Sequence, residues 1–225
     1  MKKMILSAAL VLASTAAMAQ SGTFQLKANL KNMGDTIIVY KGRGEKRDTI
    51  LVKKDKFTYS VTLNEPKQMM FAQPAIFRGG RAVAFELVGV PGETAELVGD
   101  LKTKFDIKGS NFYKQFAEVD AIKDEADKEL ADFEKSISEK MKNGGDREAL
   151  MKEYDEKAPA LTKAKEEKLL AFIGQHPDYE ASATLIGEMS SYENMQKAVD
   201  MLSAQVKNGR MKAFCEPIVE RAKKQ

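Results

Sequence analysis

Two side chains in this sequence have the chemistry of catalysis, and each residue type occurs once: Cys215 in "AFCEPIVERAKKQ" and His176 in "GQHPDYE". A single cysteine cannot form an internal disulfide, and the sequence contains neither a C-x-x-C pair nor a zinc-type cluster. A reactive thiol needs a basic partner or a helix N-terminus to lower its pKa, whereas the charge beside Cys215 is Glu216. We therefore expect Cys215 to be a buried packing residue, with a redox role or an intermolecular disulfide as alternatives.

Any Ser-His-Asp or Cys-His arrangement would have to use His176. This residue precedes Pro177 in a stretch that predicts a turn at the start of a helix, and we expect it to be a structural turn residue. No H-x-x-x-H or H-E-x-x-H spacing is present, so we expect no metal site and no cofactor. A hydrolase is therefore the weakest functional class, and we expect a non-catalytic chain.

Two glycine-containing loops carry the candidate ligand or partner contacts. "GRGEKR" contains Arg43 and Arg47, and "RGGR" contains Arg78 and Arg81. An arginine fork matches a carboxylate or a phosphate, although solvated hairpin loops have the same composition. Neither loop has the G-K-[ST] ending of a phosphate-binding loop. If the fold places both loops at one end, they form a positive rim.

The remaining charged and apolar groups predict structure or exclude functions. We expect the acidic pairs Asp124/Glu125 and Glu166/Glu167 to be solvated helix surface, and the Met69-Met70-Phe71 cluster to be strand core. Residues 20–110 carry 15 Lys and Arg against 10 Asp and Glu, whereas residues 111–225 carry 19 against 23. Nucleic-acid binding requires a stronger and more clustered basic excess, so it is excluded as an expected function.

The first nineteen residues, "MKKMILSAALVLASTAAMA", have the features of a secretory signal peptide. Two lysines precede a short apolar run, and Ala-Met-Ala forms a cleavage site before Gln20. We expect an exported, periplasmic protein that is not a lipoprotein, because no cysteine stands at the cleavage point. No later segment is apolar enough to predict a transmembrane helix.

The spacing of hydrophobic residues changes once along the rest of the chain, and this change predicts an α+β protein. Residues 20–109 alternate in hydrophobicity, as in "TFQLKANL" and "KFTYSVTL", with turn signals between the runs. This pattern predicts about eight short strands in an antiparallel β-sandwich or open barrel. Residues 110–225 change to helical spacing and form the expected helical domain.

The helical region is expected to begin with a long hairpin. One helix begins after a cap at Ser110 or Asn111, ends at Asn143-Gly144-Gly145, and is supported by charge pairs at i,i+4 such as Lys123/Asp127. A second helix begins at Asp146 and is kinked or divided by Pro159. Shorter helices are expected near residues 179–190, 192–207 and 210–223. The length of the first helix predicts that it projects or pairs with another helix, and it is a candidate surface for homo-oligomerisation.

Several segments resemble a known family. They are "GTFQLKANL…GDTIIVY", "DTILVKKDKFTYSVTL…EP", the stretch from Phe85 to Phe116 that includes "FEL…PGE" and "IKGS", and "FIGQHPDYEASATLI". Together they resemble the N-terminal domain of unknown function, with its helical linker, of exported TlpA/AhpC-TSA-type thiol–disulfide proteins. In that family a thioredoxin-fold domain with a C-x-x-C usually follows, and none follows in this sequence.

The sequence therefore predicts a non-catalytic cell-envelope module of the Gram-negative type. It would bind a partner protein or a ligand, or self-associate, and the resemblance implies that the partner is a periplasmic thioredoxin-like protein or another envelope protein. The alternative is the recognition half of a thiol–disulfide oxidoreductase system whose redox domain is separate or missing.

Overall fold

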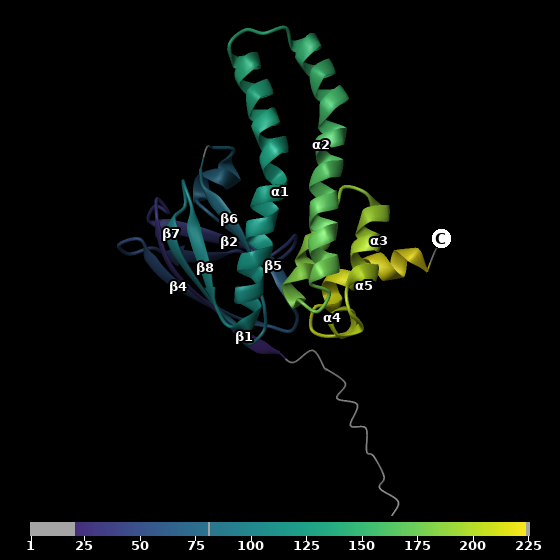
Figure 1. Ribbon diagram of the computed structural model, residues 1–225. Helices are drawn as coiled ribbons and strands as arrows, with labels where there is room; N and C mark the ends of the chain where they lie inside the picture. The colour runs from purple at the N-terminus through teal and green to yellow at the C-terminus, as the bar shows by residue number, and fades with distance from the viewer. Residues whose placement is uncertain (1–20, 81, 224–225) are drawn as a thin grey trace, which may run out of the picture.

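The computed structural model describes residues 21–80 and 82–223, and the expected signal peptide lies outside them. The predicted α+β class is confirmed, because the described residues form eight strands in two sheets followed by a helical region (Figure 1). The strands are β1 (Gly22–Lys31), β2 (Thr36–Tyr40), β3 (Asp48–Leu51), β4 (Lys56–Leu63), β5 (Lys67–Ala72), β6 (Ala84–Gly89), β7 (Thr94–Asp100) and β8 (Phe105–Gly109). The helices are η1 (Pro74–Arg78), α1 (Asn111–Lys142), α2 (Arg147–Gln175), η2 (Glu180–Glu188), α3 (Tyr192–Met201), α4 (Ala204–Asn208) and α5 (Lys212–Ala222).

The two sheets have the strand orders β4-β1-β7-β8 and β3-β2-β5-β6. Alternation along β1 places Phe24, Leu26, Ala28 and Leu30 in the core, as the period-two pattern predicts. The expectation of an all-antiparallel arrangement is wrong at one pair, because β1 and β7 run parallel, with Gln25 opposite Thr94. After β1 the chain crosses to the second sheet for β2 and β3, returns to pair β4 on one side of β1, crosses again for β5 and β6, and then returns as β7 on the other side of β1, where it runs parallel to it.

Strands and helices share one continuous hydrophobic core. The first turns of α1 insert Phe112 and Tyr113 beside strand residues, and the rings of Phe24 and Tyr113 are 6.1 Å apart. The core then runs on through Leu169 of α2 and Leu185 of η2. The helical region is therefore packed onto the sandwich as well as tethered to it.

Helices α1 and α2 form an antiparallel hairpin whose distal half projects beyond the rest of the molecule (Figure 1). With 32 residues, α1 is about 48 Å long at 1.5 Å per residue. The stacked rings of Phe133 and Tyr154, 5.9 Å apart, join the two helices in this distal half. Pro159 lies inside α2 and does not divide it.

Several expectations for the helices are corrected by tertiary contacts. Residues 180–188 form a 3-10 helix, and the helix expected over 192–207 is split between α3 and α4. The split follows from Ser203, whose N–H donates to the Pro177 carbonyl while its hydroxyl caps α4. Among the described residues, Lys123 pairs with Glu188 of η2 instead of with Asp127, because the neighbouring element brings a carboxylate closer.

Candidate binding groove

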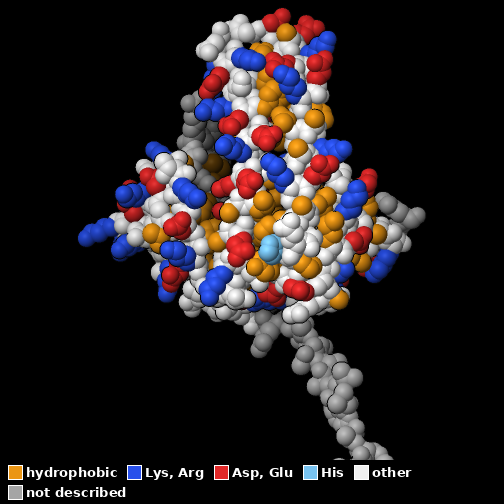
Figure 2. Space-filling view, in the orientation of Figure 1, with side chains coloured by type: hydrophobic (Ala, Val, Ile, Leu, Met, Phe, Trp, Pro, Cys, Tyr) orange, Lys and Arg blue, Asp and Glu red, His pale blue; other side chains and the backbone are white. Residues whose placement is uncertain are grey.

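A groove opens where the free edges of the two sheets face α1. Its volume is about 820 Å³, within the usual range for ligand sites. Figure 2 shows the recess between the sandwich and the column formed by α1 and α2, with hydrophobic side chains inside it. The lining comes from the edge strands β6 and β8, the β7–β8 turn, Met70 of β5 and one face of α1.

The register of β6 leaves backbone groups of Ala84 and Glu86 pointing into this groove. In an antiparallel pair, residues that bond the partner strand alternate with residues whose N–H and C=O point away from it. The Gln73 N–H donates to the Val83 carbonyl at 3.1 Å, which fixes the alternation along β5 and β6. Ala84, Glu86 and Val88 therefore belong to the outward set, and β6 has no strand on that side among the described residues.

The hydroxyl of Tyr113 supports this assignment. It donates to the Val88 carbonyl at 2.6 Å, so one outward group of β6 is bonded by α1. Burial raises the pKa of the Tyr113 hydroxyl, which stays a donor at neutral pH. The bond closes one end of the β6 edge and leaves Ala84 and Glu86 beside the groove.

The opposite edge belongs to β8. The Asp100 N–H donates to the Lys104 carbonyl at 2.9 Å, so the backbone groups of Phe105 and Ile107 point away from β7. Helix α1 follows directly after β8 and packs against it. The β8 edge is therefore covered more closely by α1 than the β6 edge is.

Aromatic side chains and carboxylates give the groove two chemical faces. Phe85 and Phe105 meet edge to face with centroids 5.8 Å apart, and Leu101 adds to this apolar floor. Asp120 and Asp124 lie one turn apart on the α1 wall. Burial, followed by the nearby charge of Asp124, raises the pKa of the Asp120 carboxyl.

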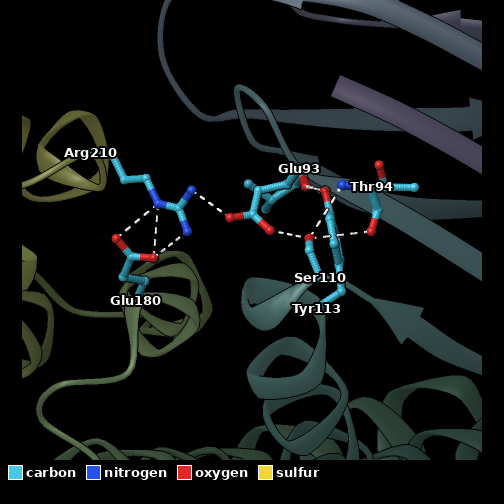
Figure 3. Close-up of polar contacts among 7 residues, drawn as sticks. Glu93, Thr94, Ser110, Tyr113, Glu180 and Arg210 are labelled. Atoms are coloured by element: carbon cyan, nitrogen blue, oxygen red, sulfur yellow. Dashed lines mark hydrogen bonds and ion pairs between the residues drawn. The ribbon is translucent and has the colours of Figure 1, made fainter. Parts of the chain in front are cut away.

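A second polar cluster fastens the helical region to the sandwich (Figure 3). The Arg210 guanidinium lies between two carboxylates, with Nη1 2.6 Å from Glu93 and Nε 2.8 Å from Glu180. The Ser110 hydroxyl donates to Glu93, and it also accepts from the Thr94 N–H at 3.3 Å. Ser110 is the N-cap residue of α1, but its side chain makes no capping bond because it is engaged with the sandwich.

The predicted arginine contacts lie away from the groove. Arg43, Arg47 and Arg78 are exposed, and none of them lines it. The structure does bring the two loops together, since the Arg47 guanidinium lies 4.2 Å from the ring centroid of Phe77 in η1. Arg81 lies outside the described residues.

Cys215 and His176 occupy structural positions. Cys215 is 1% exposed, and burial raises the pKa of its thiol to about 11. The His176 ring lies between Phe172 and Tyr179, 4.5 Å from each ring centroid, at the end of α2. These surroundings give neither side chain a reacting partner among the described residues.

One acidic residue expected on the surface is buried. Glu166 is 3% exposed and accepts hydrogen bonds from the Ser190 N–H and the Asn194 amide near the start of α3. Burial alone would raise its pKa, but these hydrogen bonds hold the pKa of the Glu166 carboxyl below its usual value. Its role is to join α2 to α3.

Reasoning from the sequence missed the groove residues. The spacing of Ala117 and Ala121 with Asp120 and Asp124 is a local signal, because small residues leave room beside two carboxylates on one helix face. The strands that complete the groove are brought there by long-range pairing, which this local signal does not contain.

The described residues contain no group of three or more His, Cys, Asp or Glu side chains placed to hold a metal ion. None of the helices in the described ranges has both the length and the apolar character needed to cross a membrane. No family model, curated protein or solved structure matches the chain.

Proposed function

We propose that this chain is a non-catalytic, exported cell-envelope module that binds a partner protein in the groove between β6, β8 and α1. The observation that carries the proposal is the groove itself, in which an apolar floor and two strand edges lie beside a carboxylate-bearing helix wall. Polar backbone groups at an open edge favour pairing with another chain. The apolar floor supplies the contact area that such pairing needs.

The compartment and the class of partner rest on the sequence. The first nineteen residues have signal-peptide features, and the resemblance to the N-terminal domain of TlpA-type proteins favours a thioredoxin-like envelope partner. The proposal assigns no thiol chemistry to Cys215, because a buried thiol with a raised pKa is a poor nucleophile. Any redox step in such an assembly belongs to the partner.

Site-specific photo-crosslinking in the native envelope tests this role. A photoreactive phenylalanine analogue at Ala121, which lines the groove, is expected to capture a defined partner that mass spectrometry identifies. The same analogue at Met151, which lies outside the groove on α2, is the matched control. Equal capture at both positions, or no capture from Ala121, would contradict the proposal. The mass of the secreted chain tests export, with cleavage before Gln20 as the expected result.

A further inference from the structure

We propose that the free edge of β6 binds an extended peptide segment of a partner protein, in which apolar residues alternate with Lys or Arg. The inference rests on the proposed binding role of the groove and specifies what occupies it. Its basis is the combination of an unpaired strand edge, an aromatic floor and two carboxylates that make no ion pair among the described residues, all around one cavity.

The backbone of β6 provides the pairing surface. The outward N–H and C=O groups of Ala84 and Glu86 are spaced to exchange hydrogen bonds with an added strand. The edge also borders a second, smaller cavity of about 90 Å³, lined by Glu86, Val88 and residues of α1 and η2. The bond from Tyr113 to the Val88 carbonyl sets the end of the available edge. An added strand can therefore pair with Ala84 and Glu86 but not with the Val88 carbonyl, which limits its length and sets its register.

Side chains around the edge select an alternating sequence. Successive residues of an added strand point to opposite faces, so one set would contact the floor formed by Phe85 and Phe105. The other set would lie on the same face as Glu86, where a cross-strand partner of opposite charge is favourable. The Glu86 carboxylate accepts a hydrogen bond from the Gln68 amide at 2.5 Å and lies beside the groove.

The α1 wall adds to the preference for a cation. Among the described residues, Asp120 and Asp124 make no ion pair, whereas Lys123 is engaged by Glu188. The charges of Lys123 and, to a smaller extent, Lys104 offset part of the burial effect that raises the pKa of Asp120. A peptide Lys or Arg would supply a counter-charge for Asp120 and Asp124. On the β8 wall, Asp106 and Lys108 carry opposite charges, so together they add no net charge to the groove.

Fluorescence anisotropy with labelled heptapeptides tests the inference on the chain lacking residues 1–19. A peptide of alternating Val and Lys is expected to bind saturably, and a peptide of alternating Val and Glu at least tenfold more weakly. N-methylation of alternate amides in the Lys peptide, which removes strand donors, is also expected to weaken binding at least tenfold.

Two variants with matched controls locate the site. Ala84→Pro removes an outward N–H that the β5–β6 ladder does not use, so we expect the fold to tolerate it. Peptide binding is expected to fall at least tenfold. Ala84→Ser keeps the N–H and is expected to keep the affinity. The double variant Asp120→Asn with Asp124→Asn is expected to weaken binding of the Lys peptide at least threefold. Asp132→Asn with Glu139→Gln, both on α1 outside the groove, is the charge-matched control. Circular dichroism verifies that each variant is folded.

Three outcomes would overturn the inference. Binding that is indifferent to N-methylation would rule out strand pairing. Absence of peptide binding, combined with capture of a partner from Ala121, would refute the extended-peptide occupant and leave the proposed function standing. A concentration-dependent dimer that Ala84→Pro abolishes would identify a second copy of the chain as the occupant instead.

Discussion

Replacing Arg210 by Met is expected to lower the free energy of unfolding by about 2 kcal/mol. The Arg210 guanidinium bridges Glu180 of η2 and Glu93, which lies between β6 and β7. Removing it leaves two carboxylates facing one another without a counter-charge. This bridge joins the helical region to the sandwich, so its loss weakens the contact between them.

The magnitude follows from the burial of the three side chains. Breaking a fully buried ion pair costs about 3–5 kcal/mol, whereas an exposed pair contributes about 0–1 kcal/mol. Here the side chains of Arg210, Glu93 and Glu180 are 33%, 12% and 29% exposed, between these limits. In the variant, Glu93 keeps its hydrogen bond from Ser110, and Glu180, which is more exposed, can be hydrated by water. The expected cost therefore lies between the two limits, at about 2 kcal/mol.

Urea denaturation followed by circular dichroism measures the loss, and thermal melting is expected to show a decrease of about 4–8 °C. Lys163→Met removes a pair with Glu167 whose side chains are 77% and 66% exposed, and is expected to cost less than about 0.5 kcal/mol. A double-mutant cycle of Arg210→Met with Glu93→Gln isolates the coupling between these two residues. A loss no larger than that of Lys163→Met, or no coupling in the cycle, would refute the reasoning.

Three further predictions concern single positions. Tyr113→Phe leaves the Val88 carbonyl without its donor and is expected to cost about 1–3 kcal/mol in urea denaturation; an unchanged midpoint would contradict this bond. Gly109→Ala is expected to destabilise the fold by about 2 kcal/mol or more, because φ is 143° and an added Cβ would lie 2.1 Å from the Thr94 carbonyl oxygen. A melting temperature equal to that of the unsubstituted chain would show that the end of β8 relaxes around the added methyl group. Because burial raises the pKa of Cys215 to about 11, its thiolate is scarce at pH 8, and iodoacetamide is expected to label it only after unfolding; rapid labelling of the folded chain would disprove its burial.

The parts of the fold that depend on neighbours in sequence could be predicted. Alternation along β1 and β4 identifies the inward residues, and the Asn143-Gly144-Gly145 stretch ends α1 where expected. Both features are set by periods of two or 3.6 residues and by the backbone freedom of glycine, which act within a few positions. The left-handed φ of 82° at Gly144 is such a local requirement.

The candidate site depends on contacts that local patterns do not encode. The groove requires β8 and β6 to be edge strands of the two separate sheets. The edge position of β8 depends on the long-range pairing of β7 with β1, and the two edges meet only when the sheets pack together. Glu166 resembles its exposed neighbour Glu167 in sequence, but the start of α3 covers only Glu166. Ser110 has the type and position of a helix cap, yet Glu93 offers its hydroxyl a stronger partner.

The position of β1 in the middle of its sheet also bears on how the chain folds. When β1 and β4 have paired, the other side of β1 stays open until residues 94–100 arrive. Pairings between distant segments form slowly, because the loop between them must be closed first. During that interval the exposed side of β1 is a template for other chains, so refolding at high protein concentration competes with aggregation. The pairing of β7 with β1 covers this side of β1 and ends the competition.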